Sequence, residues 1–326
     1  MSQRARSCVE IEPDLMATAM GEAEPAQSRR VNAHVGGCPP CHRNLEQYRT
    51  IDHEVGRLAS EGSEGQNVAR SRERLEARLL DLRSRLVAYE IFPSPFGGIL
   101  IARSEQGVLL VEYLRGHGRT AFKESRLTGA RGIEAVEVRG EVERFYRELR
   151  DYLEGRTHRL TWPLDFRLAR SPFHRKVLEA TAAIPYGAVM SYRGLACEIG
   201  RPEAVRATAQ ALRWNPLPIV VPCHRVIGSS GALTGYAGGK TGRKQRLLTI
   251  EGVPTVRRRD DFEVRRDAMY VLAPGEHDYC LPTCPSVDPF PRGGLLFGAR
   301  DRAEAQGLHP CTTCRPDLHP LTSVKH

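Results

Sequence analysis

The sequence predicts an α/β protein of several domains, in which a core of strands and helices is flanked by two small cysteine-rich modules. Three observations predict this arrangement. Strand-like runs follow one another from residue 86, short helical patterns follow from residue 171, and cysteines gather near both ends of the chain. At 326 residues the chain is too long for one ordinary core, so two or three domains are expected.

Composition limits the function classes. The chain carries 48 Lys+Arg against 39 Asp+Glu, a formal net charge of +9, which attracts polyanionic partners without specifying one. Hydrophobic residues make up 40% of the chain, as is usual in globular proteins. No apolar run is long enough to cross a bilayer, and the opening stretch MSQRARSCVEIEPDL lacks the apolar core of a secretion signal. We therefore expect a cytoplasmic protein with no membrane partner.

The first segment runs to about residue 62 and ends in a Gly/Ser-containing linker, SEGSEGQN at 60–67. A charged helix follows, ARSRERLEARLLDLRSRL, with leucines at four-three-four spacing on one stripe (Leu75, Leu79, Leu82, Leu86). The stripe is shorter than two full heptads, so a coiled coil is weakly indicated. We expect a linker helix over 63–85 that lies on its neighbour.

The middle segment, about 86–255, opens with the strand-like run LVAYEI. The runs GILIAR and VLLVEYL come next and are separated by SEQG, which predicts a hairpin. An amphipathic helix is predicted over 141–155. Ser171 caps a further helix that has Pro172 at its first position.

Two short helices follow in the same segment. One begins at Ser191 and stops at Gly200, and the other begins at Pro202 and ends before Asn215. Two helices around a tight glycine turn are typical of a helix-turn-helix, although the spacing fits a plain helical hairpin equally well. The last segment, from about 256, is rich in Pro and Gly and predicts little regular structure beyond the short strand AMYVLA.

The tetrapeptide PCHR occurs twice, and the two copies have different surroundings. The first lies in HVGGCPPC, where His34, Cys38 and Cys41 have the spacing H-x3-C-x2-C. A short C-x2-C turn points two thiolates at one ion, and zinc takes tetrahedral S and N ligands. Cys8 can supply the fourth ligand, so zinc is favoured over unrelated buried thiols.

The order of Cys8, His34, Cys38 and Cys41 resembles the zinc-binding domain of bacterial anti-sigma factors over about the first 55 residues. The resemblance implies a small zinc-held helical module that binds a partner or responds to thiol oxidation. A sigma factor is the partner that it suggests.

The second copy contains Cys223 and His224, with no cysteine at metal-loop spacing. The pair stands at the end of the apolar run NPLPIVVPCHR. The small-residue loop VIGSSGALTGYAGG follows this run, and its glycines allow a ligand to come close to the backbone. A buried thiol beside a histidine is an arrangement in which a base produces a thiolate nucleophile. Glu251, in RKQRLLTIEG, could orient the histidine as a third member.

This region closely resembles the O6-alkylguanine-DNA alkyltransferases. The matching stretches are IPYGAVMSY at 184–192, RATAQALRWNP at 206–216, PIVVPCHRVIGSSGALTGYAGG at 218–239 and RKQRLL at 243–248. The resemblance covers 86–252. It implies a ribonuclease-H-like α/β subdomain followed by a helical, helix-turn-helix catalytic core.

The resemblance also implies a mechanism. The helix from Pro202 would enter the DNA minor groove, where Ala207 and Ala211 permit close approach and Arg206 replaces the flipped base in the stack. Cys223 would accept the alkyl group.

Other residues would assist. His224 would take the thiol proton through a water, Glu251 would stabilise the imidazolium, and Tyr192 would donate to the leaving base. The remaining positions are structural: Asn215 would brace the turn, and the alkyl pocket would be lined by Pro218, Tyr236 and Ala237.

The spacing departs from the family at one point. The stretch between Tyr236 and Glu251 is one residue longer than usual, so Ile250 falls at the strict position. A one-residue insertion in the loop at Lys240–Gly242 restores Glu251. A cysteine at position 223, where non-catalytic relatives have tryptophan, favours a reactive protein over a binding-only one.

The four C-terminal cysteines have the spacing Cys280-x3-Cys284 and Cys311-x2-Cys314, which predicts a four-thiolate zinc site. YCLPTC and GLHPCTTCRPD resemble the metal-binding domain of the bacterial adaptive-response (Ada) proteins over about 268–317. That family implies that Cys280 is both a ligand and a candidate acceptor of methyl groups from phosphotriesters. The basic residues expected beside the first two cysteines are replaced by APGEHDY and LPTCPSVD, which disfavours that second activity.

We thus predict a DNA repair protein that transfers an alkyl group from O6-alkylguanine in double-stranded DNA to its own Cys223, once per molecule. The predicted parts are an anti-sigma-like module (1–62), a helical linker (63–85), the ribonuclease-H-like subdomain (86–168), the catalytic domain (169–255) and an Ada-type zinc domain (256–326). Two structural zinc ions and no organic cofactor are expected. The alternatives are a zinc-thiol regulator that binds a sigma factor, with the alkyltransferase as damage sensor, and a module that only marks lesions.

Overall fold

A computed structural model of the chain describes residues 3–60, 64–114, 122–123, 125–234, 241–259, 261–288 and 293–321. The chain divides into two compact units, Met1–Asp81 and Leu82–His326. Every helix among the described residues is too short or too polar to span a bilayer.

The first unit is helical. It contains α1 (Gln3–Ala19), α2 (Pro25–Val35) and α3 (Pro39–Ser60), and α1 packs against both of the others. Its core is small, and its buried hydrophobic members are Ile11, Leu15, Val31, Cys41 and Leu45. Because so little apolar area is buried, a metal ion is an expected additional source of stability.

Helix α4 (Glu64–Arg85) begins inside the predicted linker and crosses the boundary between the two units. Its predicted leucine stripe is exposed, since Leu75 is 59%, Leu79 49% and Leu82 41% accessible. The expectation that this stripe lies on a neighbour is therefore wrong. Ion pairs such as that of Arg72 with Glu76 support a solvated helix instead.

The second unit opens with a four-stranded sheet in the order β3-β2-β1-β4. Its strands are β1 (Leu86–Ser94), β2 (Gly97–Arg103), β3 (Val108–Leu114) and β4 (Glu134–Glu137). The first three are antiparallel neighbours, as the predicted hairpin requires, and β4 runs parallel to β1. At the β2–β3 turn Gly107 has φ +148° and lies against Pro163, where a Cβ would approach the Pro163 carbonyl oxygen to 2.2 Å.

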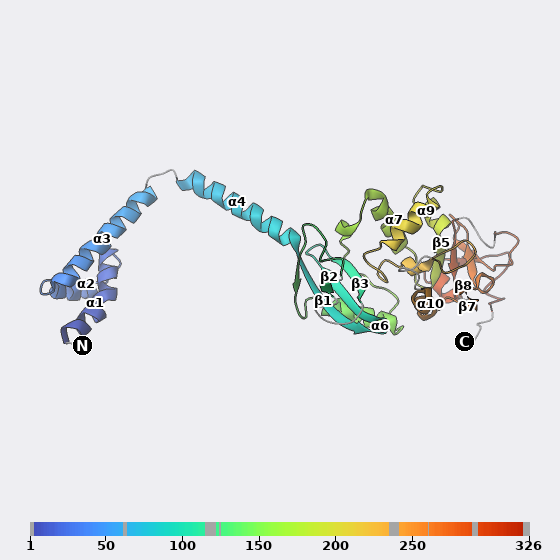
Figure 1. The fold of residues 1–326 in the computed structure, drawn as a ribbon, viewed down its shortest axis with the longest axis horizontal. Coiled ribbons are helices and arrows are strands. Elements are labelled where there is room, and N and C mark those ends of the chain that lie inside the picture. The colour runs from blue at the N-terminus through green and yellow to red at the C-terminus, as the bar shows by residue number, and fades with distance from the viewer. Residues whose placement is uncertain are drawn as a thin grey trace. The chain divides into compact units, whose positions relative to one another are not determined.

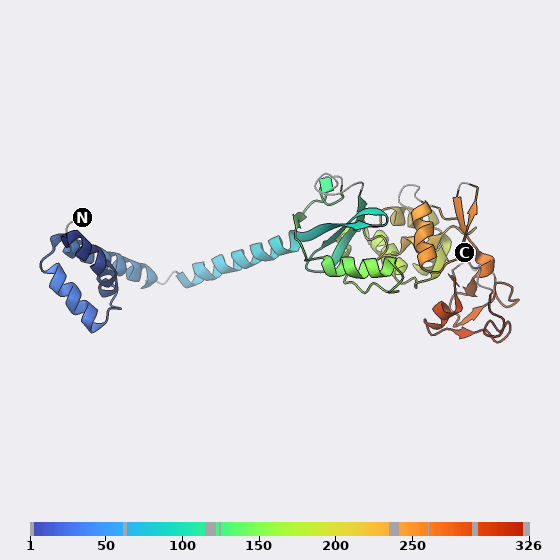
Figure 2. The same cartoon turned by 90° about the horizontal axis from the view of Figure 1, so that it is seen from below.

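Because successive side chains along a strand point to opposite faces, this sheet has two faces, and both are buried. Ile99 and Ile101 pack into the main core with α6 (Glu143–Leu153), whereas Leu100 and Ala102 belong to a smaller cluster on the other face. Helix α6 matches the predicted amphipathic helix. Figures 1 and 2 both show it lying along the sheet.

The part of the second unit predicted as the catalytic domain follows through η1 (Phe166–Leu168) and is mostly helical. Its helices are α7 (Pro172–Ala182), α8 (Tyr192–Glu198), α9 (Val205–Arg213) and α10 (Thr241–Ile250). The predicted caps are confirmed, because Ser171 accepts from the His174 N–H and Ser191 accepts from the Gly194 N–H. Helix α9 begins at Val205 and not at Pro202, since a turn closed by the Ala204 N–H on the Arg201 carbonyl precedes it.

A second sheet joins this mostly helical part to the C-terminal segment, in the order β12-β10-β9-β11-β5-β6. β5 (Ala188–Ser191) and β6 (Val226–Ile227) belong to the mostly helical part. The other four are β9 (Tyr270–Leu272), β10 (Asp278–Cys280), β11 (Leu295–Phe297) and β12 (His309–Pro310). Strand β11 pairs antiparallel with β5, so the sheet crosses the boundary predicted at 255.

The C-terminal segment therefore has more regular structure than the predicted single strand. Besides β9 to β12 it contains the hairpin of β7 (Thr255–Arg258) and β8 (Asp261–Val264), together with η3 (Arg266–Ala268) and α11 (Arg300–Glu304). These strands are too short to show a period of two. Gly298 lets the segment approach α10, because a Cβ there would lie 2.5 Å from the Gly252 carbonyl oxygen.

Candidate functional site

Cys223 lies at the start of the short helix η2 (Cys223–Arg225), directly before β6. Its N–H donates to the Val221 carbonyl at 2.8 Å, and the apolar run before it is buried. Asn215 holds this run, because its side-chain amide donates to the Val221 carbonyl at 2.8 Å and accepts from the Leu217 N–H at 2.9 Å. The sulfur atom is thus set at a fixed position.

Burial raises the pKa of the Cys223 thiol above its ordinary value. A hydrogen bond from Asn215 and the positive charges of Lys244 and Arg126 act in the opposite direction without outweighing burial. The resting thiol therefore keeps its proton near neutral pH. Nucleophilic use of this sulfur needs a base.

His224 has no exposed surface and hydrogen-bonds through Nε2 to Glu251 Oε1 at 2.5 Å. A carboxylate can only accept, so Nε2 carries the proton and Nδ1 keeps its lone pair. Nδ1 has no hydrogen-bond partner among the described residues. Burial lowers the pKa of His224, with Arg225 and Lys244 adding to the effect and Glu251 opposing it. The ring is therefore neutral and ready to accept a proton at Nδ1.

Glu251 follows α10 directly and is 1% exposed. Its Oε2 atom accepts from Arg225 Nε at 2.8 Å and from the Gly187 N–H at 3.2 Å, and the Tyr152 hydroxyl donates to Oε1. Burial would raise the pKa of Glu251, but His224 and Arg225 outweigh it and hold the value at about 2. Of these two groups, Arg225 carries a permanent positive charge and lies 2.8 Å from Oε2.

Arg225 and Tyr152 also belong to this network, although neither was predicted as a site residue. Arg225 Nη2 donates to the Tyr152 hydroxyl at 2.9 Å, and Nη1 donates to the Ile184 carbonyl at 2.5 Å. Arg225 is the last residue of the PCHR tetrapeptide, so the motif itself pointed to this member of the network. Tyr152 lies on α6, far along the chain, and its helical position gave no sign of this contact.

Lys244 is a third residue that the sequence analysis missed. It is fully buried on α10, and its Nζ donates to the Val226 carbonyl at 2.5 Å and to the Thr234 carbonyl at 3.1 Å. Burial lowers the pKa of Lys244 to about 8, although Cys223 and Asp261 partly oppose the shift. A cation is thereby held beside the sulfur atom.

Tyr192 lies close to this cation. Its hydroxyl donates to the Thr234 carbonyl at 3.1 Å, and the Lys244 Nζ lies 5.6 Å from its ring centroid. Burial raises the pKa of Tyr192, and the nearby Cys223 adds to the effect. Pro218 is buried in the run before Cys223, whereas Tyr236 and Ala237 lie outside the described residues.

The residues predicted to meet DNA lie on α9 and divide between two faces. Arg206 and Ala207 are exposed, while Ala211 is 8% exposed and packs into the main core. Arg206 is therefore presented to solvent on the second of the two short helices. Ala211 shapes the packing of that helix.

The N-terminal ligand set fits a tetrahedral metal ion. Cys8, His34, Cys38 and Cys41 bring their ligand atoms within 4.8 Å of one another. The Cys8 and Cys38 sulfur atoms are 3.7 Å apart, and His34 Nε2 lies 3.3 Å from the Cys41 sulfur. Zinc–sulfur bonds of about 2.3 Å at tetrahedral angles place two sulfur atoms about 3.8 Å apart, so zinc matches this set.

The C-terminal set gathers from β10 and the two turns that hold the other cysteines. The ligand atoms of Cys280, Cys284, Cys311 and Cys314 also lie within 4.8 Å of one another. The Leu281 N–H donates to the Cys314 sulfur at 3.3 Å, which orients it. Four thiols at this separation repel one another as anions unless a cation neutralises them, so this set also fits zinc.

Metal analysis of single-cysteine variants tests both sites. We expect two zinc ions per purified chain, and Cys284→Ser and Cys38→Ser should each lose one of them, because a structural site needs its four ligands. Cys197→Ser, outside both sets, should keep both ions. The readouts are elemental mass spectrometry and thermal unfolding, and full zinc content in Cys284→Ser would contradict the assignment of the C-terminal site.

Comparisons with known proteins agree with this geometry. Residues 172–253 match the family model described as the DNA binding domain of 6-O-methylguanine DNA methyltransferase, and residues 267–317 match the metal binding domain of Ada. The constitutive methylated-DNA–protein-cysteine methyltransferase of Bacillus subtilis (strain 168) is 39% identical over 165 residues, which are 51% of this chain and 95% of that protein.

Two further comparisons give similar coverage. The methylated-DNA–protein-cysteine methyltransferase of Methanosarcina acetivorans is 39% identical over 166 residues, covering 50% of this chain and 97% of that protein. A crystal structure of Mycobacterium tuberculosis OGT in complex with DNA shows 34% identity and a TM-score of 0.43, over 50% of this chain and 92% of that one.

Proposed function

This chain belongs to the methylated-DNA–protein-cysteine methyltransferases, which repair DNA by alkyl transfer, and on that premise we propose that Cys223 is its acceptor. The observation that carries the proposal is the buried thiol followed by a neutral histidine whose far nitrogen is held by Glu251. A thiol with a raised pKa needs such a base beside it.

The proposed reaction is a single displacement. His224 takes the Cys223 proton at Nδ1 through a water, and the thiolate attacks the alkyl carbon of O6-alkylguanine. The new carbon–sulfur bond forms as the carbon–O6 bond breaks, and the electron pair leaves with guanine. Tyr192 turns from the Thr234 carbonyl to donate to the leaving base, where negative charge develops.

Two cations would support the charges that arise. Lys244, close to the sulfur atom, favours the thiolate, and Arg225 keeps Glu251 ionised so that the carboxylate can stabilise the protonated histidine. The product is a thioether at Cys223. Among the described residues we identify no group that would remove the alkyl carbon, so each molecule acts once.

The proposal is tested by mapping methyl groups on the unsubstituted protein. Full-length, zinc-loaded protein is incubated with duplex DNA that contains O6-methylguanine and is then digested for peptide mass spectrometry. We expect one methyl group, on the peptide with Cys223. Intact binding to lesion DNA without any methyl transfer would instead support lesion marking.

Arg206 is proposed to fill the stack when the damaged base is flipped out. Arg206→Ala should slow transfer from duplex DNA by about tenfold or more, because unstacking a base costs a few kcal/mol and the substitute side chain is lost. Transfer from free O6-methylguanine base should not change, since no stack is opened. Arg147→Ala, exposed on α6, is the charge-matched control, and equal slowing on both substrates would contradict the role of Arg206.

The other predicted parts stand as proposals. The order β3-β2-β1-β4 supports a ribonuclease-H-like subdomain over 86–168. The three helices and the cysteine–histidine set of residues 1–62 support a zinc-held module of the anti-sigma type. Co-purification of a sigma factor that is lost in Cys38→Ser would support the regulatory alternative.

Cys280 is the proposed second acceptor, from methylphosphotriesters. Two arginines of the C-terminal segment give little help with a phosphate, because Arg300 pairs with Glu304 at 2.7 Å and Arg315 pairs with Asp317 at 2.9 Å. Peptide mass spectrometry after incubation with methylphosphotriester DNA measures this activity separately from transfer to Cys223.

A further inference from the structure

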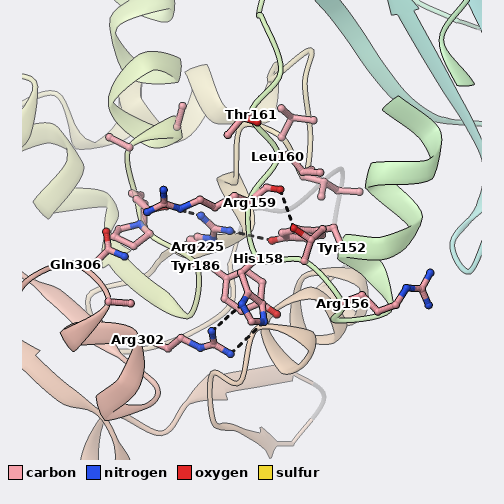
Figure 3. A pocket seen from close by; sticks show the side chains of 18 residues that line it. Tyr152, Arg156, His158, Arg159, Leu160, Thr161, Tyr186, Arg225, Arg302 and Gln306 are labelled. Atoms are coloured by element: carbon pink, nitrogen blue, oxygen red, sulfur yellow. Dashed lines mark hydrogen bonds between the residues drawn. The ribbon is translucent and has the colours of Figure 1, made fainter. Parts of the chain in front are cut away.

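A cavity of about 740 Å³ lies behind the Glu251 network, on the side of Arg225 and Tyr152. Its walls include residues 156–161 after α6, the Ile184–Tyr186 turn, and Arg302 on α11 of the C-terminal segment. Figure 3 shows the side chains that line it. A cavity of this size can hold a small organic ligand.

The lining is rich in arginine. It includes the arginines Arg156, Arg159, Arg225 and Arg302 together with His158, and none of its residues is acidic. Such a wall attracts anions and repels cations, and the field is stronger in a hollow than on a flat surface. The charge therefore indicates an anionic ligand.

The four arginines differ in whether their guanidinium groups are already paired with a carboxylate. Arg225 is held by Glu251, Tyr152 and the Ile184 carbonyl, and Arg156 pairs with Asp151 and Glu154 outside the cavity. Arg159 has no ion pair within the part of the chain that the structure describes. Its donors are therefore available to a ligand.

Arg302 also lacks a close carboxylate partner in the described part of the chain, although its Nη2 atom lies 3.5 Å from His158 Nε2. Its only carboxylate contact among the described residues is a long one, 3.7 Å to the exposed Asp301. Its Nη1 lies 3.1 Å from His158 Nδ1, and its guanidinium lies 4.9 Å from the Tyr186 ring centroid. In Figure 3, Arg159 and Arg302 lie on opposite sides of the His158 and Tyr186 rings. Two guanidinium groups without a close carboxylate partner in the described structure therefore line one cavity.

The aromatic surface indicates which kind of anion fits. The His158 and Tyr186 rings lie 4.5 Å apart, and Arg302 approaches Tyr186, so these rings are already in contact with one another and with a cation. Little ring surface is left for a nucleobase. Guanidinium groups instead match phosphate oxygens, with two parallel N–H donors each.

We propose that this cavity binds a small phosphate-bearing anion of the pyrophosphate or polyphosphate class, held by Arg159 and Arg302. The site needs both the alkyltransferase half and the C-terminal segment, because Arg159 precedes η1 and Arg302 stands on α11. Arg302 also packs on the active-site turn, where its Cγ atom would lie 3.0 Å from a Cβ at Gly187.

Isothermal titration calorimetry of the full-length, zinc-loaded protein with inorganic pyrophosphate tests the proposal, and ATP is the second probe. We expect saturable binding of one pyrophosphate per chain. Arg159→Gln and Arg302→Gln should each weaken it about tenfold or more, because each removes a charge-assisted contact. ATP that binds no more tightly than pyrophosphate would agree with recognition of the phosphate groups alone.

Arg139→Gln is the matched control, since Arg139 is exposed, does not line the cavity, and changes the net charge equally. It should bind pyrophosphate like the unsubstituted protein. Absence of saturable binding, or equal weakening in all three variants, would overturn the proposal. Methyl transfer from duplex DNA should be retained in the variants, which shows that they are folded.

A measurement on the unsubstituted protein does not depend on the folding of variants. Phenylglyoxal modifies accessible arginines, and the modified positions are found by peptide mass spectrometry. Pyrophosphate should protect Arg159 and Arg302 and leave Arg139 reactive. Equal modification of Arg159 with and without pyrophosphate would overturn the site.

Discussion

Replacing Cys223 with alanine is expected to abolish methyl transfer from O6-methylguanine DNA while the fold and the zinc content stay unchanged. The sulfur atom is the proposed nucleophile, and no other group of the site can form the carbon–sulfur bond. The side chain is small and its loss leaves His224, Glu251 and Arg225 paired as before, so stability should fall by about 1 kcal/mol or less. Peptide mass spectrometry and single-turnover kinetics measure the loss.

Cys197→Ala is the matched control, because Cys197 is the other cysteine outside the two metal-ligand sets. It should transfer at the unsubstituted rate. Methyl groups that still leave the DNA in Cys223→Ala would show that a different residue accepts them. Unchanged transfer by that variant would remove the basis of the proposed mechanism.

Replacing Glu251 with glutamine is expected to cause the largest loss of stability. The carboxylate is fully buried against Arg225, and glutamine leaves the Arg225 charge without a buried counter-charge. Breaking a buried pair by removing one partner costs about 3–5 kcal/mol. Denaturant unfolding of the zinc-loaded protein measures this change.

The same substitution should slow transfer by about 10²-fold or more, because an amide in place of the carboxylate no longer fixes the proton on His224 Nε2. Glu179→Gln, in the exposed pair with Arg175, should change neither stability nor rate appreciably. Transfer by Glu251→Gln at the unsubstituted rate, in folded protein, would show that the carboxylate is structural only.

The pH dependence of the free energy of unfolding provides a second test of the contribution of Glu251. Its pKa is held at about 2, below the ordinary value of 4.5, so the folded state binds fewer protons than the unfolded state between these values. The carboxylate therefore contributes stability that is fully present above pH 4.5, and this contribution is lost as the pH falls towards 2. The stability difference between the unsubstituted protein and Glu251→Gln should shrink over the same interval.

Local patterns predicted much of what surrounds the site. The strands β1 to β3 follow from apolar runs and the SEQG turn, and the starts of α7 and α8 follow from Ser171 and Ser191. The metal-ligand sets follow from cysteine spacing, since a C-x2-C turn already points two sulfur atoms at one ion. These features depend on backbone geometry over a few residues, which a sequence contains directly.

The choice between Ile250 and Glu251 needed the tertiary structure. In the structure Glu251 reaches His224, whereas the Ile250 carbonyl accepts from the Tyr186 hydroxyl. Spacing alone favoured Ile250, because the number of residues between two positions does not tell where a loop absorbs an extra one.

By itself the sequence predicted the adjacent pair Cys223–His224, the two metal-ligand sets and the main strands and helices around them, because each of these is carried by neighbours along the chain. Only the tertiary structure decided that Arg225 and Tyr152 complete the network of Glu251, that β11 extends the sheet of β5, and that Arg159 and Arg302 line one cavity. The physical reason is that these contacts depend on which side chains are buried, and so desolvated, next to one another in the folded protein. Burial of a charge beside its partner is set by packing between segments that lie far apart in sequence.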